Sequence, residues 1–317
     1  MKMPGHKQNG AALLAAMITV SIVASIASAA IWMQWRQVEI EIAERGRDQT
    51  RWLMTGAFDW TRLILSEDAR TSSAVDHLGE PWAIPVEESK LSTFLAQDKQ
   101  WREGDPEVYL SGAISDAQGR LNLTSLSVGQ AGNPYLVGAL SNLFEQLELP
   151  VAELDALLTR WGKSADEQAP TGLQPRYIDQ LAWFGLSAQT IEALRPYVTI
   201  LPEATPVNVN TASEVVLAAM LQAYGLDPSK ARSLIKERRR KPWPNKESVD
   251  QALPGQNAAV RDKLVFDVKS RYFEVHGRLR LDQTVQTEVL LVKREGTQTR
   301  VLSRSATTQR PRYNVEP

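Results

Sequence analysis

The segment from Gln8 to Trp35 contains no ionisable side chain, and this feature constrains the chain more than any other. Its apolar part, Ala11 to Met33, is long enough as an α-helix to cross a hydrocarbon core of roughly 30 Å. Lys2, His6 and Lys7 precede it without any acidic residue. Because short basic flanks stay in the cytoplasm, we expect a single-pass membrane protein whose N-terminus is cytoplasmic and whose bulk lies across the membrane.

Helical periodicity continues beyond the apolar segment. Apolar residues recur mainly at steps of three and four, and no proline occurs between Pro4 and Pro81. The pattern predicts one long helix from Ala11 to about Leu65, on the order of 80 Å at 1.5 Å per residue. Its second half carries a stripe that is more apolar than a solvated helix needs, formed by Trp52, Leu53, Trp60 and Ile64.

A cleaved secretory signal is the alternative interpretation of this N-terminus. Ala27-Ser28-Ala29 fits the small-x-small rule for cleavage after an apolar stretch, and the mature chain would then begin at Ala30. A cleaved signal needs no order beyond its cut site, yet the helical pattern continues well past it. The pattern therefore favours a retained anchor.

A short basic leader ending in Gly10, followed by an apolar segment and an amphipathic extension, resembles the N-terminus of type IV pilins and type II secretion pseudopilins. The resemblance implies that a prepilin peptidase cuts between Gly10 and Ala11 and that the new amine is methylated. In these families the residue after the cut is normally Phe or Met, and the fifth mature residue is normally Glu. Here they are Ala11 and Ala15. Among pseudopilins, the minor subunit K typically lacks that Glu.

Two further strings are similar to the subunit K family. The first, Gly79-Glu80-Pro81-Trp82-Ala83, follows the long helix. The second runs from Gly112 to Leu123 and matches the family pattern Gly-x-Ile-x-Asp-x-Gln-Gly-Arg-Phe-Asn-Leu, with Leu121 in place of Phe. Its residues predict strand, turn and strand, with a turn from Asp116 to Gly119 in which the glycine can take positive φ.

The residues after these strings change from a helical to a strand pattern. Helices are predicted at Leu136–Leu147, Val151–Trp161, Ala188–Tyr197, Ser213–Tyr224 and Ser229–Arg239. After Val265 an alternation of period two predicts strands as far as Ser303, with a turn at residues 294–297. A connection of about 140 residues between strands is far longer than a loop, so it must be a folded unit.

The predicted fold class is α+β: a long membrane-spanning helix packed on an antiparallel sheet in the pilin manner, with a large all-α domain inserted between strands. The predicted segments are a prepilin leader (1–10), the transmembrane part of the helix (11–35), the pilin-like helix and first strands (36–123), the inserted helical domain (124–263) with a helix-hairpin-helix-like unit (206–249), the C-terminal strands (264–305) and a disordered tail (306–317). The resemblance to subunit K implies the same architecture over nearly the whole chain.

The function implied by the resemblance is that of a minor pseudopilin of the type II protein secretion machinery, in the inner membrane of a Gram-negative bacterium with its bulk periplasmic. Implied partners are other minor pseudopilins in a tip complex, the prepilin peptidase and the inner-membrane secretion platform. We expect the stripe on the long helix to bind the other subunits. Ala15 cannot ion-pair with a neighbouring terminal ammonium, and a bulky insertion would collide with a subunit above it, so the expected place is the filament tip, where the subunit would initiate assembly.

A competence-type DNA receptor, also membrane-anchored, is the alternative function. The strings Pro206 to Ala212 and Tyr224 to Ala231 resemble helix-hairpin-helix units, whose Gly-x-Gly hairpin exposes amides to a phosphate. Here Asp227 stands at the second glycine, and as a helix N-cap it would occupy those amides and repel phosphate. The basic run from Lys236 to Lys241 keeps this alternative open, although basic residues also complement a helix C-terminus. With 36 Lys and Arg against 37 Asp and Glu, no net charge favours nucleic acid, so nucleic acid is not an expected partner.

Composition also argues against an enzyme. The chain has no Cys, only three His and no phosphate-loop or nucleophile motif, so no catalytic residue, cofactor or metal site is predicted. Calcium is possible from the resemblance, since subunit K proteins carry it in the helical domain on an acidic loop. Here Tyr177-Ile178-Asp179 leads directly into Gln180-Leu181 without that loop, and the nearby acids Asp166, Glu167 and Asp179 form no recognisable calcium motif.

Overall fold

The computed structural model describes residues 9–71, 75–91, 107–127, 133–164, 174–253, 265–281 and 284–306. The chain divides into two compact units, Met1–Thr55 and Gly56–Pro317. The predicted leader therefore lies outside the described residues as far as residue 8, and the predicted disordered tail lies outside them from residue 307 onward.

The N-terminal helix α1 is a single element, Asn9–Thr71, and supplies all the described residues of the first unit. It begins two residues earlier and ends six residues later than the predicted 11–65. Uninterrupted backbone hydrogen bonding is possible over this length because no proline removes an N–H donor. In the described part of the chain, α1 is the helix that is long and apolar enough to cross a membrane.

The second unit contains a five-stranded antiparallel sheet with strand order β1-β2-β7-β8-β9. Its strands are β1 (Val86–Lys90), β2 (Val108–Asp116), β7 (Tyr272–Leu281), β8 (Thr284–Glu295) and β9 (Gln298–Ala306). The last turns of α1 lie on the β8–β9 end, because Arg62 and Ser66 donate hydrogen bonds to the carbonyls of Thr299 and Thr297, at 3.0 and 2.6 Å. Phe58 of the same helix segment is buried, under the guanidinium of Arg304.

Strands β2 and β7 are neighbours in the sheet although a long helical segment separates them in the sequence. Their register pairs Gly112 with Gly277. A Cβ atom on Gly112 would lie 2.8 Å from the carbonyl oxygen of His276, so the close approach of the two strands requires glycine there. The first glycine of the Gly-x-Ile-x-Asp string is thus explained by packing between strands.

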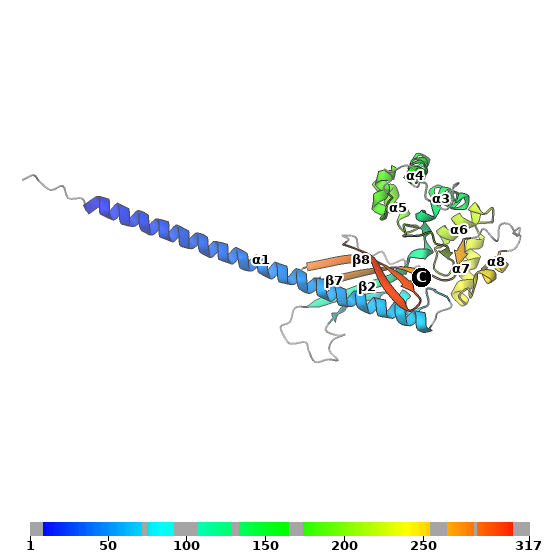
Figure 1. The fold of residues 1–317 in the computed structure, drawn as a ribbon, viewed down its shortest axis with the longest axis horizontal. Coiled ribbons are helices and arrows are strands. Elements are labelled where there is room, and N and C mark those ends of the chain that lie inside the picture. Colours follow the sequence, from blue (N-terminus) through cyan, green and yellow to red (C-terminus); the bar gives the residue numbers. More distant parts are fainter. Residues whose placement is uncertain are drawn as a thin grey trace, which may run out of the picture. The chain divides into compact units, whose positions relative to one another are not determined.

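The helical part between β2 and β7 contains all five predicted helices, with ends shifted by a few residues. They are α3 (Pro134–Gln146), α4 (Val151–Ser164), α5 (Ala188–Leu194), α6 (Glu214–Ala223) and α7 (Lys230–Arg240). The prediction missed the 3-10 helix η5 (Ile178–Phe184) and the short α8 (Lys246–Ala252). Within the second unit, Figure 1 shows helices α3 to α8, in green to yellow, gathered apart from the strands of the sheet.

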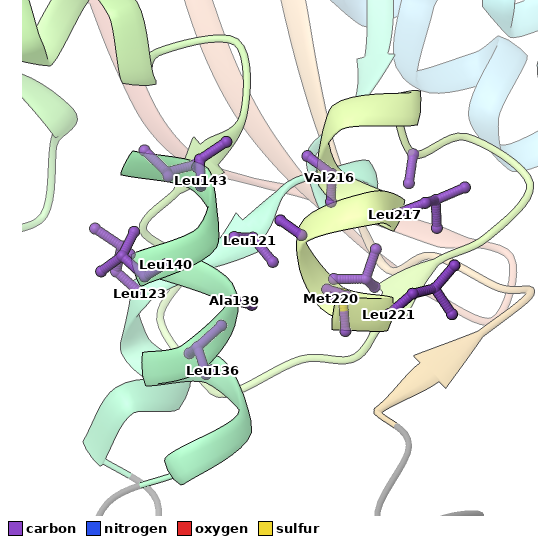
Figure 2. Close-up of a cluster of buried hydrophobic side chains, with 14 of the residues drawn as sticks. Leu121, Leu123, Leu136, Ala139, Leu140, Leu143, Val216, Leu217, Met220 and Leu221 are labelled. Atoms are coloured by element: carbon purple, nitrogen blue, oxygen red, sulfur yellow. The ribbon is translucent and has the colours of Figure 1, made fainter. Parts of the chain in front are cut away.

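The core of this helical part forms where α3 and α6 pack against each other. Apolar residues at steps of three and four place one face of each helix inward. Figure 2 shows the buried members of this cluster from α3 (Leu136, Ala139, Leu140, Leu143), from α6 (Val216, Leu217, Met220, Leu221) and from the segment after β2 (Leu121, Leu123). The segment that leaves the sheet therefore continues directly into the helical core.

The predicted strand, turn and strand after Gly112 is only partly correct. Residues 117–119 form the 3-10 helix η3, and β3 (Leu121–Asn122) does not return to β2 but pairs in parallel with β4 (Val198–Thr199). Gly119 does not use the positive φ that glycine allows, since the described glycines with positive φ are Gly185, Gly225 and Gly296. The last of these lies in the predicted turn between β8 and β9.

Candidate functional site

The predicted cleavage site lies in the first turn of α1. The helix begins at Asn9, so the peptide bond between Gly10 and Ala11 belongs to a helical segment, and the Ala11 side chain is exposed. Residues 1–8 lie outside the described part of the chain. Cleavage at this bond stays a prediction.

The four predicted stripe residues differ in exposure. In the first unit Trp52 is 76% exposed and Leu53 is half-buried; in the second unit Trp60 is 45% exposed and Ile64 is half-buried. The sequence reasoning missed Leu63, which is 59% exposed. Trp60 and Leu63 are three residues apart and therefore lie on one helix face.

The opposite face of α1 is the one that the sheet covers. Phe58 and Leu65 are buried, and their spacing of seven residues places them two helical turns apart on the same side. The predicted stripe contained neither Phe58 nor Leu65, and periodicity shows that a face is apolar but not which of two apolar faces is covered. We call Trp60 and Leu63 the exposed helix face.

A buried ion-pair cluster joins the last turn of α1 to the end of β8. Arg294 donates from Nη1 to Asp68 Oδ2 at 2.8 Å, and from Nη2 to Asp76 Oδ1 and to the Ser270 carbonyl. Its guanidinium carbon also lies 4.7 Å from the ring centre of Phe273. Burial raises the pKa of Asp68, and the Arg294 charge opposes that rise. The cluster stabilises the position of α1 on the sheet only while both aspartates keep their partner.

The Gly79-Glu80-Pro81-Trp82 string packs against this cluster. Glu80 is 3% exposed, and its Oε2 accepts hydrogen bonds from the His77 backbone N–H at 3.0 Å and from Trp82 Nε1 at 2.7 Å. Trp82 packs edge-on against Phe273, with ring centroids 5.2 Å apart. Burial raises the pKa of Glu80 to about 7.

Asp116 of the second string holds the helical part against the sheet. Its Oδ2 accepts from Thr211 Oγ1 at 2.6 Å, Ser270 Oγ at 2.5 Å and Asn208 Nδ2 at 3.0 Å, and its Oδ1 accepts from the Gln118 N–H at 2.7 Å. Burial raises the pKa of Asp116, and these hydrogen bonds oppose the rise. The turn residue of the sequence prediction is therefore the centre of a buried polar network.

Arg120 of the same string forms an ion pair with β7. Its Nη2 lies 2.7 Å from Glu274 Oε2. Although burial opposes ionisation of Glu274, Arg120 and the neighbouring His276 hold its pKa at about 2. The string thus supplies a glycine at the strand contact, a buried acid and an ion-paired base, all of them with structural roles.

Asp227 and Arg238 of the helix-hairpin-helix-like segment have partners within the segment. Asp227 accepts hydrogen bonds from the Ser229 N–H at 2.9 Å and from the Ser229 hydroxyl at 2.7 Å, so it occupies one of the hairpin amides. The prediction that Asp227 is the helix N-cap is wrong, because α7 begins at Lys230, one residue later than predicted, and its N-cap is Ser229. Arg238 of the basic run donates to the carbonyls of Val209 and Ala212, both at 2.6 Å. These contacts disfavour a phosphate site.

One group of carboxylates in the described residues has spacing suitable for a cation: one oxygen each from Asp68, Asp76 and Glu80 lies within 4.8 Å of the others. Both oxygens of Asp76 are already used, by Arg294 and by the Ser270 N–H. Calcium takes six to eight oxygen ligands, so this group does not fit it. Of the acids considered for calcium, Asp179 pairs with Arg195, whereas Asp166 and Glu167 lie outside the described residues.

Comparisons with known proteins agree with the architecture. A family model described as "Type II secretion system (T2SS), protein K" matches residues 207–268. Proteins named type II secretion system protein K are 28% identical in Pseudomonas aeruginosa, covering 90% of this chain and 89% of that protein, and 28% identical in Klebsiella pneumoniae, covering 75% and 77%. A third, from Pectobacterium carotovorum, is 24% identical over 94% of this chain and 96% of its own length.

A solved structure shares the fold. The crystal structure of the GspK-GspI-GspJ complex from the type 2 secretion system of enterotoxigenic Escherichia coli contains a chain that matches with a TM-score of 0.65 at 19% identity, covering 84% of this chain and 99% of that chain. The match confirms the predicted α+β class with its long helix, antiparallel sheet and helical insertion.

Proposed function

The chain belongs to the type II secretion system protein K family, and from this premise we propose that it is the minor pseudopilin that occupies the tip of a periplasmic pseudopilus and initiates its assembly. Members of this family are structural components of a secretion machine and are not known as enzymes. The described residues contain one helix suited to anchoring the chain in a membrane.

The exposed helix face supports binding to other minor pseudopilins. A relative of this chain forms a complex with GspI and GspJ. In this chain Trp60 and Leu63 present a large aromatic and an aliphatic side chain to solvent on the face opposite to the buried Phe58 and Leu65. Aromatic side chains of this kind are typical centres of protein interfaces. We propose that GspI-like and GspJ-like subunits pack on this face.

The tip position is supported by the residue at position 15. An ordinary pilin carries a carboxylate there that can neutralise the terminal ammonium of a neighbour inside the lipid, where an unpaired charge is costly. Ala15 offers no such group, so the subunit cannot dock onto an existing filament in that way. Its own amine at Ala11 would still attract the carboxylate of the next subunit, which suits the first place.

The helical insertion supports the same position. Helices α3 to α8 lie between β2 and β7 in the sequence. The strands outside this insertion, β1, β2, β7, β8 and β9, form one sheet. A filament shaft repeats one contact between successive subunits, and a domain of this size leaves little room for a subunit above it. At the end of the filament that space is free.

The proposed topology follows from the basic leader and the apolar helix. The N-terminus would lie in the cytoplasm of a Gram-negative cell, residues 11–35 in the inner membrane and the second unit in the periplasm. The prepilin peptidase would then reach the Gly10–Ala11 bond from the cytoplasmic side. The inner-membrane platform of the secretion system would be the site where the subunit is added to others.

Site-specific photo-crosslinking in cells tests the partners and the position together. A photoreactive residue in place of Leu63 should form adducts with minor pseudopilins. The same residue in place of Ser233, which is exposed on α7, should not. Labelling that finds the protein repeated along the shaft would refute the tip assignment. Adducts that form equally at both positions would refute the proposed interface.

A further inference from the structure

The buried cluster beneath α1 holds more negative charge than positive charge. Asp68, Asp76 and Glu80 bring carboxylate oxygens within 4.8 Å of one another, and Arg294 is the guanidinium that contacts two of them. With every group ionised, three carboxylates and one guanidinium give a formal charge of −2. Each carboxylate is at most 6% exposed, and an uncompensated charge at that depth is strongly unfavourable.

Some carboxylate oxygens of the cluster have hydrogen-bond donors and others do not. Asp76 uses both oxygens, and Asp68 Oδ2 and Glu80 Oε2 each have partners. Asp68 Oδ1 and Glu80 Oε1 are buried and have no hydrogen-bond partner among the described residues. A charged carboxylate with a buried oxygen that no donor reaches is unfavourable, and a proton on one of these carboxyl groups removes its charge.

His77 does not supply that proton. Its Nδ1 accepts the Gly79 N–H at 3.0 Å, so the ring is in the tautomer that carries hydrogen on Nε2. Nε2 lies 4.0 Å from Glu80 Oε1, which is too long for a hydrogen bond. Burial lowers the pKa of His77, which favours the uncharged ring.

We propose that Glu80 is a neutral carboxylic acid in the folded protein, so that the contact between the end of α1 and the loop at residues 75–84 depends on a bound proton. The proton removes one negative charge from the buried cluster. Its loss leaves the cluster at a formal charge of −2 and separates the loop from the helix end.

The pKa of Glu80 agrees with a neutral carboxylic acid at this position. Burial is the main cause that raises the pKa of Glu80 to about 7, the charges of Asp68 and Asp76 add to it, and the His77 N–H and Trp82 oppose it. Because this pKa lies above the usual value for Glu, the folded state binds the proton more tightly than the unfolded state. The contribution to stability is therefore complete below about pH 4.5 and is lost as the pH rises towards about 7.

The test is the variant Glu80→Gln in the full-length protein in detergent. A glutamine keeps an oxygen that accepts from Trp82 and from the His77 N–H, and it is uncharged at every pH. We expect the unfolding midpoint of the natural protein to fall between about pH 5 and about pH 8, and that of Glu80→Gln to fall less, so that the variant is at least as stable at about pH 8. Glu67→Gln, an exposed neighbour on α1, is the matched control and should keep the natural pH profile.

Infrared spectroscopy of the natural protein keeps the proposal testable if the variant does not fold. With isotope-labelled glutamate, the carboxylic-acid band of one glutamate should persist at about pH 6 and disappear with a midpoint near pH 7. The proposal is overturned if all labelled glutamates are ionised at about pH 6. It is equally overturned if a folded Glu80→Gln protein is less stable at every pH with an unchanged slope.

Discussion

Gly119 lies so close to Thr211 that a Cβ atom at this position would be 2.9 Å from the Thr211 hydroxyl oxygen and 3.2 Å from its carbonyl carbon and oxygen. Gly119 ends the short 3-10 helix after β2, and Thr211 precedes α6 in the helical part. The contact therefore joins the sheet to the helical insertion at the place where the Asp116 network also joins them.

The first prediction concerns this contact. Gly119→Ala should lower the free energy of unfolding by about 1–3 kcal/mol, because the added methyl group meets backbone atoms that cannot move aside easily. Gly162→Ala in α4 is the matched control, since nothing lies within 4 Å of a Cβ there and alanine favours a helix. Chemical denaturation of both variants measures the difference, and equal stabilities would contradict the packing argument.

The second prediction concerns Arg294. Arg294→Met should cost about 3–5 kcal/mol at neutral pH, because it leaves Asp68 and Asp76 buried without their cation. The Arg294 charge opposes the rise in the pKa of Asp68, so without Arg294 this carboxylate binds a proton more readily in the folded state, and the defect should shrink as the pH falls. Denaturation at several pH values checks this. Arg300→Met, on the exposed side of β9, should show neither the loss nor the pH dependence.

The third prediction separates the two faces of α1. Removing the exposed helix face with Trp60→Ala and Leu63→Ala should change stability by less than about 1 kcal/mol but weaken binding to minor pseudopilins by about tenfold or more. Phe58→Ala should instead destabilise the fold by about 3–5 kcal/mol because it empties a buried site. Binding assays with purified partners, run beside denaturation curves, distinguish these results. Unchanged binding by a folded double variant would remove Trp60 and Leu63 from the interface.

The fourth prediction concerns processing. Mass spectrometry of the protein from its native membrane should find a chain that begins at Ala11 and carries an N-methyl group, and Gly10→Val should block this maturation. The same substitution leaves the apolar segment intact, so insertion into the membrane should continue. A chain that begins at Ala30 would instead support the secretory-signal interpretation.

Local pattern predicted the helices that are long or strongly periodic. Helix α1 and helices α3 to α7 were found because their apolar residues repeat at three- and four-residue steps and polar or proline residues bound them. Helix η5 was missed because a 3-10 helix does not follow the α-helical period. Helix α8 was missed because Val249 is its one buried residue, whereas the equally short α5 has Ile191 and Leu194 three residues apart. The partner of β3 was also missed, because β3 and β4 have only two residues each and lie far apart in the sequence.

The sequence by itself determined the membrane helix, the period of each major element and the family resemblance, because hydropathy and spacing are properties of neighbouring residues. Only the tertiary structure decided which face of α1 the sheet covers, why position 119 is glycine and which oxygens of Glu80 and Asp68 lack a donor. The physical reason is distance along the chain: Arg294 reaches Asp68 across 226 positions, and Thr211 reaches Asp116 across 95. Burial and charge at such sites depend on residues that no local pattern brings together.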